Sequence, residues 1–267
     1  MRKAKGIKGM NTIITSYDVD AMIRADADKD APDTWMKTGI PSLDNLLSSR
    51  DDSHPKPIYG GEMIIISGDE KEGKTTFARS VTDSLAGAGK HALWFSYEET
   101  AKQFVRKFGA NVPLFYLPDE LAGSTVEWIT DRVKSAKAHL AKDGAKLQAV
   151  FIDHLHYLVD LEGKTNNITV EIGGVCRKLK RLAIAENIAL FLIVHTNRTE
   201  GQEEPTVRSL RDSGMIGKEA DTVLFVWRVE IPDDGAMVKI AVTRGSGVKN
   251  RSVKLIKQGP FLKEYFG

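Results

Sequence analysis

A glycine-rich segment carries the strongest chemical signal in the sequence. Residues 68–75 read GDEKEGKT, a complete G-x-x-x-x-G-K-[ST] pattern. Its two glycines allow successive backbone N–H groups to point inward at the phosphates of a nucleotide. An apolar segment precedes the pattern and a helical one follows it, so the start of that helix adds the positive end of its dipole. We therefore predict a phosphate-binding loop between a strand and a helix.

The residues of this loop have separate expected roles. Lys74 should reach the β- and γ-phosphate oxygens of ATP, and the hydroxyl of Thr75 should ligate Mg²⁺. The acidic side chains within the loop should point outward, because acids are unusual beside a polyanion. The residues predicted to bind the nucleotide are Gly68, Glu72, Gly73, Lys74, Thr75 and Thr76.

Two acidic strand ends complete the predicted catalytic set. Asp153 ends an apolar segment, as in the Walker-B arrangement, and its carboxylate should hold the Mg²⁺ shell. Glu98 follows the apolar segment after the loop helix and could polarise a water for attack on the γ-phosphate. Glu99 is the alternative for this role, and both glutamates could instead start a helix, where acids suit the first turn. His154 and His156 suggest zinc, but the sequence offers no cysteine or third ligand at a useful spacing.

The elements that must position these residues alternate along the chain. Segments that are apolar on both faces predict parallel strands, and apolar residues spaced by three and four predict amphipathic helices. This alternation indicates a doubly wound α/β sheet with helices on both faces. The predicted strands are 63–66, 92–95, 149–152, 190–194 and 222–226, and the clearest helices are 126–140 and 168–182. Residues 238–240 and 253–255 alternate apolar with polar, which predicts antiparallel strands at the C-terminal end.

Composition and charge are those of an ordinary soluble protein. Of 267 residues, 42% are hydrophobic and 28% are charged, no apolar run approaches the length of a membrane span, and no secretory core follows the basic start. The single cysteine, Cys176, excludes an internal disulfide and fits a reducing compartment. We therefore expect a cytoplasmic protein, in the host cell if viral, with no membrane partner. The net charge of +2 includes four basic residues among the first ten, which excludes a strongly basic nucleic-acid coat over the remainder.

The chain divides into two predicted parts. Residues 1–37 combine a basic tip, a small apolar face and a polar stretch, and we expect an N-terminal extension or linker. Because its apolar face is too small to bury itself alone, this part could dock on the main body or on a neighbouring subunit, or form a loosely held linker. Residues 38–267 should form the ATPase domain.

From about residue 38 onward the sequence resembles a known group, the RecA-fold hexameric replicative helicases, both DnaB-like and phage primase-helicase-like. TGIPSLD at 38–44 resembles the segment before the family's first strand, and SYE at 96–98 resembles its second motif, whose glutamate activates water. LRDSGMI at 210–216, together with 220–228, is close to the fourth motif and is rarely shared by unrelated phosphate-loop proteins. The resemblance implies a RecA-like P-loop NTPase core, ATP and Mg²⁺ as cofactors, and a homo-oligomeric hexameric ring.

Two further roles follow from the resemblance alone. His195 lies where the third motif has a histidine or glutamine that senses the γ-phosphate and signals to a DNA-contacting loop, and a histidine is more typical of the phage and mitochondrial members. Arg244 lies where the family has an arginine finger that reaches a neighbour's ATP. The bacterial pattern often has a lysine at the position of Val242, so Arg251 or Lys249 could supply that second charge, or the role is absent.

Nucleic-acid contacts are expected in the loops after Asp153 and after His195. In a ring these loops would line a central channel and follow the phosphate backbone of single-stranded DNA. Each charge could instead be a solvated surface residue. The residues predicted to bind nucleic acid are Lys164, Arg198, Arg208, Arg211 and Gly214.

Three functions are compatible with these features. The first is an ATP-dependent DNA helicase, a ring motor that translocates on single-stranded DNA and unwinds duplex during replication. The second is a RecA-like recombinase or recombination mediator that binds single-stranded DNA without unwinding, and the third is a regulatory scaffold ATPase of the same fold. The stretch 211–214 favours DNA over the scaffold. No primase, zinc-binding or helical N-terminal domain is recognisable, which leaves room for a separate primase or loader as partner.

Overall fold

The computed structural model describes residues 15–17, 35–48, 56–159, 168–196, 205–206, 210, 213–229, 235–244 and 246–266. Contacts divide the chain into a unit of residues Met1–Asp33 and a unit of residues Thr34–Gly267. Residues 35–37 of the predicted extension belong to the second unit, where Trp35 and Met36 pair with Tyr59 and Ile58. Of the first unit the structure describes only residues 15–17, so the docking predicted for the rest of the extension stays a prediction. The division of function between 1–37 and 38–267 stays a prediction.

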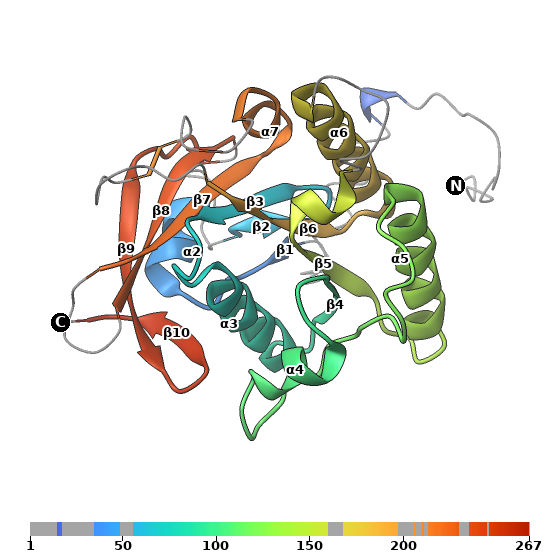
Figure 1. Cartoon of the computed structure of the whole chain (residues 1–267), viewed down its shortest axis with the longest axis horizontal. Coiled ribbons are helices and arrows are strands. Elements are labelled where there is room, and N and C mark those ends of the chain that lie inside the picture. Colours follow the sequence, from blue (N-terminus) through green and yellow to red (C-terminus); the bar gives the residue numbers. More distant parts are fainter. Residues whose placement is uncertain are drawn as a thin grey trace. The chain divides into compact units, whose positions relative to one another are not determined.

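A mixed sheet organises the second unit (Figure 1). Its strand order among the described residues is β10-β9-β8-β7-β3-β6-β5-β4, with a separate antiparallel pair of β1 and β2. The strands are β1 Trp35–Met36, β2 Ile58–Tyr59, β3 Met63–Gly68, β4 His91–Ser96, β5 Leu147–Asp153, β6 Ala189–His195, β7 Thr222–Arg228, β8 Gly235–Thr243, β9 Arg251–Gln258 and β10 Phe261–Glu264. Five neighbouring strands, β4, β5, β6, β3 and β7, pair in parallel. The strands β7, β8, β9 and β10 pair antiparallel. The predicted parallel strands and C-terminal antiparallel strands are confirmed.

Helices cover both faces of this sheet (Figure 1). They are α2 Pro41–Leu47, α3 Lys74–Gly87, α4 Ala101–Arg106, α5 Val126–Ala141, the 3₁₀ helix η1 Leu155–Leu158, α6 Ile168–Glu186 and α7 Ser213–Glu219. The alternation of side chains along β3 explains the two layers. Ile64 and Ile66 pack with α2, α3 and α4, whereas Met63 and Ile65 pack with α5, α6 and α7. The predicted doubly wound α/β architecture is confirmed.

Three aromatic rings stack across neighbouring parallel strands inside the α3 face of the sheet. The Phe151 ring lies between Trp94 and Phe191, with centroid distances of 4.6 and 4.4 Å and interplanar angles of 7°. All three side chains are fully buried. Because Phe151 lies two residues before Asp153, this stack fixes the strand that carries the predicted metal ligand.

The Asp221 carboxylate joins three elements at the amino ends of the parallel strands. Asp221 Oδ2 accepts hydrogen bonds from the backbone N–H of Met63 at 2.7 Å and from Lys180 Nζ at 2.6 Å, and Lys180 also donates to the carbonyl of Gly61. These bonds connect the starts of β3 and β7 to α6. Asp221, which belongs to the motif at 220–228, therefore has a structural role in joining these elements.

Among the described helices, none has both the length and the apolarity to span a lipid bilayer.

The aromatic stack gives a test of what holds the core together. We expect Phe151→Ala to lower the free energy of unfolding by about 3–5 kcal/mol, because the site cannot collapse between two flanking rings. Leu114→Ala removes a side chain that is 60% exposed and should change it by less than about 0.5 kcal/mol. Denaturant titration followed by circular dichroism measures both, and equal losses would contradict the assignment.

Candidate nucleotide site

The carboxyl ends of four parallel strands meet at one edge of the sheet and carry the predicted site. Gly68 at the end of β3 is in register with His195 at the end of β6, and Ser96 at the end of β4 is in register with Asp153 at the end of β5. Ligands bind outside the carboxyl ends of strands in open α/β sheets. The sheet thus brings together residues that lie far apart in the sequence.

The structure explains separately why glycine is required at each of the two glycine positions of the phosphate loop. A Cβ on Gly68 would lie 2.2 Å from the backbone oxygen of Val226, so only glycine allows β3 to pass β7 at this point. Gly73 precedes α3 with φ of +100°, a left-handed conformation that side chains rarely adopt. The predicted order of strand, loop and helix is confirmed, and the loop ends at the N-terminus of α3.

Lys74 and Thr75 begin α3 and face the strand ends. Lys74 is buried and its Nζ donates a hydrogen bond to the carbonyl of Asp69 at 2.7 Å. Burial lowers the pKa of the Lys74 ammonium, and the negative charges of Asp153 and Glu98 oppose that shift. This ammonium is therefore held in a carboxylate-lined environment, at the start of a helix.

Thr75 and Asp153 form the contact on which a metal position depends. Thr75 Oγ1 donates to Asp153 Oδ2 at 2.8 Å. Asp153 is only 2% exposed, and burial, together with the charge of Glu98, raises the pKa of its carboxyl to about 6. Mg²⁺ prefers hard oxygen ligands such as these, and its charge would compensate for the lost solvation of the carboxylate. The pair therefore fits the predicted magnesium ligands.

The acidic residues of the loop are mostly bound to flanking strands. The carboxylate of Asp69 accepts a hydrogen bond from the Thr196 hydroxyl after β6, and that of Glu72 accepts one from the backbone N–H of Arg228 at the end of β7. Glu70 is exposed and lines the cleft. The backbone N–H of Glu72 donates a long hydrogen bond, at 3.4 Å, to the carbonyl of Asp69, so the predicted contact of Glu72 with a phosphate stays a prediction.

A cleft of about 440 Å³ lies over these groups. It is lined by Lys74, Thr75 and Thr76 of α3, and by Glu98, Asp153 and His195, which lie at or just after the ends of three strands. Lys107 and Arg228 also line it, and the sequence predicted neither of them as a site residue. The sequence could have indicated them only by their positions, since Arg228 ends β7 beside the loop strand and Lys107 follows α4. The cleft can accept a polyphosphate flanked by several cations.

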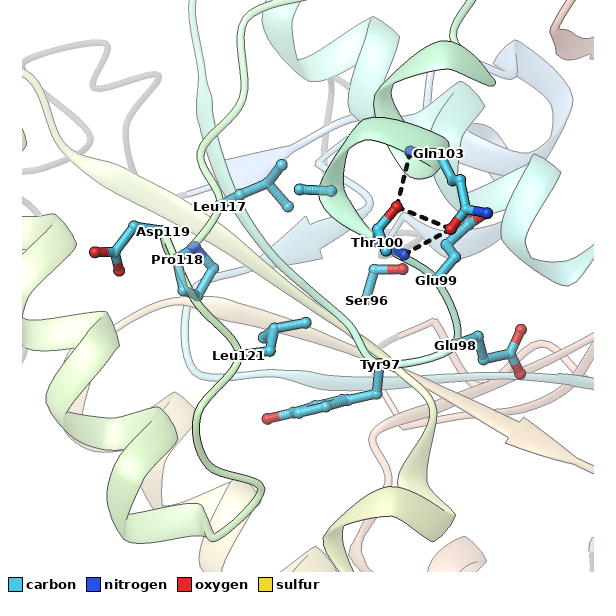
Figure 2. A pocket seen from close by; sticks show the side chains of 11 residues that line it. Ser96, Tyr97, Glu98, Glu99, Thr100, Gln103, Leu117, Pro118, Asp119 and Leu121 are labelled. Atoms are coloured by element: carbon cyan, nitrogen blue, oxygen red, sulfur yellow. Dashed lines mark hydrogen bonds between the residues drawn. The ribbon is translucent and has the colours of Figure 1, made fainter.

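The structure distinguishes the two candidate glutamates. Glu99 forms an ion pair with Lys107 at 2.6 Å and is 13% exposed, whereas Glu98 is 42% exposed. Figure 2 shows Glu98 extending away from the cap that Thr100 and Gln103 form at the start of α4. Because α4 begins after Thr100, neither glutamate lies in the helix. The helix-start alternative is therefore wrong, and the geometry favours Glu98.

Two histidines flank the Glu98 carboxylate. Glu98 Oε1 lies 3.5 Å from His195 Nε2 and 3.6 Å from His154 Nδ1. The hydrogen bond from His195 is the main cause that lowers the Glu98 pKa, so its carboxylate is ionised at neutral pH. Burial lowers the pKa of His154 to about 4, which keeps its ring neutral. Residue spacing indicated no third ligand beside His154, because Glu98 and His195 come from other strands.

Comparisons with known proteins show which family the chain belongs to. The sequence pattern of the family described as DnaB-like helicase C terminal domain matches residues 110–259, more than half of the chain. The chain belongs to this family. The match begins after the phosphate loop, so the loop is an independent indication of nucleotide binding.

Other DnaB-like proteins show the same relationship. The replicative DNA helicase DnaB of Haemophilus influenzae is 26% identical over 234 residues, which cover 76% of this chain and 48% of that protein. The DnaB of Pasteurella multocida is 24% identical, with 85% and 54% covered. The chain thus spans about half the length of these curated relatives.

Solved structures support the fold of this DnaB-like domain. A solved ATPase domain superposes with a TM-score of 0.75 at 18% identity, covering 95% of this chain and all of that one. A DnaB-like replicative helicase, studied for its interactions with primase, gives a TM-score of 0.72 at 17% identity and covers 95% and 68%. The predicted RecA-like P-loop fold is confirmed.

The remaining predicted residues of the DnaB-like domain lie away from this cleft or outside the described residues. Arg244 is exposed, donates from Nη2 to the carbonyl of Lys218 in α7, and is not among the described residues that line the cleft. Gly214 lies within α7. Lys164, Arg198, Arg208 and Arg211 lie outside the described residues. Their predicted nucleic-acid contacts stay predictions.

The close approach at Gly68 gives a test of the loop. We expect Gly68→Ala to cost about 1–3 kcal/mol of stability, since the new Cβ meets backbone that cannot rotate away, and to weaken nucleotide binding about tenfold or more. Gly87→Ala at the end of α3 meets nothing within 4 Å and is the matched control. Thermal unfolding and titration with a fluorescent ATP analogue and Mg²⁺ measure both. Equal behaviour of the two variants would contradict the assigned role of Gly68.

Proposed function

We propose that this chain is the motor of a replicative DNA helicase, which couples ATP hydrolysis to translocation on single-stranded DNA and to duplex unwinding. The observation that carries the proposal is the convergence of Lys74, the Thr75–Asp153 pair and Glu98 in one cleft of a DnaB-like domain. The relatives named replicative helicases support the same activity. Nothing in these findings favours the recombinase or scaffold alternatives.

The cleft residues divide the chemistry among themselves. Lys74 binds phosphate oxygens and offsets their charge, and Thr75 and Asp153 hold the metal position. A bound Mg²⁺ would supply charge stabilisation for the transferred phosphoryl group. Glu98 orients a water and accepts its proton, since its ionised carboxylate faces the cleft. His195, next to both Glu98 and the loop strand, is placed to report the state of the γ-phosphate to the segment that follows it.

Assembly into a ring explains why the proposed set is incomplete within one chain. Arg244 does not line the cleft of its own chain, and an arginine that stabilises transition-state charge must reach the phosphoryl group. We propose that Arg244 acts on the nucleotide of a neighbouring copy in a homo-oligomer, most simply a hexamer. A primase or loader supplied as a separate chain is a further proposed partner, and a DnaB-like structural relative was studied with primase.

The glutamates provide a matched test of the proposed activity. Wild-type chain should hydrolyse ATP faster with single-stranded DNA and should unwind a forked duplex in an ATP-dependent manner. Glu98→Gln should lower ATP turnover by about 10²–10⁴-fold while nucleotide binding persists, because a general base contributes this much. Glu99→Gln, which removes the carboxylate paired with Lys107, should keep a rate near that of the wild type.

Phosphate release and strand separation measure these effects. Equal loss in both variants would contradict the assignment of Glu98. Hydrolysis that ignores DNA, together with a forked duplex that stays annealed, would contradict the helicase proposal.

The role of Arg244 in a neighbouring site can be tested by mixing variants. Arg244→Ala alone should lower turnover by about 10³-fold or more with nucleotide binding retained. When mixed with Glu98→Gln, it should recover turnover, because a seam can then combine an intact Glu98 from one chain with an intact Arg244 from the other. Turnover measured across mixing ratios gives the result. Absence of recovery, or loss of nucleotide binding in Arg244→Ala, would indicate a structural role through Lys218 instead.

A further inference from the structure

We propose that Glu98, His154 and His195 form a binding site for a transition-metal ion of the Zn²⁺ class, and that an ion held there blocks hydrolysis. One ligand atom from each of these residues lies within 4.8 Å of the other two. Two imidazoles and one carboxylate form a set that binds zinc in proteins with a position left open. The consequence for hydrolysis rests on the proposed function, whereas the binding of the ion does not.

The distances from Glu98 to the two histidines are close to the ligand separations around a bound ion. A tetrahedral ion with metal–ligand bonds of about 2.0–2.1 Å separates its ligands by about 3.3–3.4 Å. Glu98 Oε1 lies 3.5 Å from His195 Nε2 and 3.6 Å from His154 Nδ1. The two imidazole rings approach with a centroid distance of 4.3 Å. Both Glu98–histidine distances therefore exceed the tetrahedral value by only a few tenths of an ångström, and the two histidine ligand atoms lie within 4.8 Å of each other.

The scaffold holds these ligands at the ends of strands. His195 ends β6, His154 directly follows β5, and Glu98 follows β4 by two residues. The side chains of His154 and His195 are 14% and 21% exposed, so packing restricts them, whereas Glu98 and His195 also line the cleft. An ion can therefore enter from the cleft, and its open position would face a water or a phosphate oxygen.

Ligand chemistry separates this site from the magnesium position. Thr75 and Asp153 offer only oxygen atoms, which suit Mg²⁺, whereas imidazole nitrogens suit Zn²⁺ and similar ions. The local charge also favours a divalent cation. The negative charge of Glu98 raises the pKa of Asp153, so the two carboxylates repel each other, and Lys74 and His195 offset part of this effect. A cation at Glu98 relieves this repulsion.

An ion at this site would remove the proposed base. A Glu98 carboxylate oxygen bound to a metal is a poor proton acceptor, and the same ion would hold His195 away from a γ-phosphate. Saturating Zn²⁺ should then lower ATP turnover by about 10²-fold or more, the contribution of a general base. Chelation should reverse this effect.

Cobalt provides a readout that does not depend on activity. Wild-type chain titrated with Co²⁺ alone should develop the intense visible absorption of a four- or five-coordinate ion at one equivalent per chain, and Zn²⁺ should displace it. His154→Gln and His195→Gln should each weaken binding by about 100-fold or more, since loss of a second-shell partner alone costs about 10–100-fold. His139→Gln alters an exposed histidine on α5 and is the matched control.

The outcomes separate the two proposals. Absorption in wild type and His139→Gln that is lost in both site variants, with circular dichroism unchanged, supports the site whether or not the chain hydrolyses ATP. Absence of this absorption in wild type, or its persistence in a folded His154→Gln and a folded His195→Gln, overturns the site. If the chain hydrolyses ATP but develops no Co²⁺ absorption, the proposed function stands and the metal-site proposal is contradicted.

Discussion

The parallel pairing of β3, β4, β5 and β6 is the constraint from which the candidate site follows. Parallel strands in register end at one edge, so the residues after their last apolar positions must lie together. The aromatic stack through Phe151 fixes the position of β5, and the close contact of Gly68 with Val226 fixes the bend after β3. A shift in either strand would separate Thr75 from Asp153. The chemistry proposed for the cleft therefore depends on packing several residues away.

Charge burial is the second feature that connects fold to function. Asp153 and Lys74 are both buried, and in each case burial is the leading cause of a shifted pKa that disfavours the charged form. A protein gains little stability from such groups on their own. Their arrangement is favourable for binding, because a magnesium ion and a polyphosphate supply the opposite charges together. By contrast, the hydrogen bond from His195 lowers the pKa of Glu98 and keeps its carboxylate ionised, as a general base requires.

The sequence predicted the elements well and the contacts between them less well. The phosphate loop, the strand ending at Asp153 and the two long helices could be predicted because periodicity and motif spacing are local properties. The choice between Glu98 and Glu99 required the Lys107 ion pair, which joins two segments separated by α4. The grouping of His154 with Glu98 and His195 depends on strand order, which no spacing of residues encodes. Likewise Asp221, singled out as part of a family motif, proved to join β3, β7 and α6.

If the proposed function is correct, Thr75 and Asp153 hold a metal beside a triphosphate in a cleft completed by a neighbouring chain. Electron cryomicroscopy of the chain with Mg²⁺, a non-hydrolysable ATP analogue and single-stranded DNA tests this arrangement most directly. We predict a ring with the analogue's phosphates on the 68–75 loop, density for Mg²⁺ between Thr75 and Asp153, and Arg244 of the adjacent copy directed at the γ-phosphate. A nucleotide bound elsewhere, or bound at the loop with its metal distant from Asp153, would contradict the account.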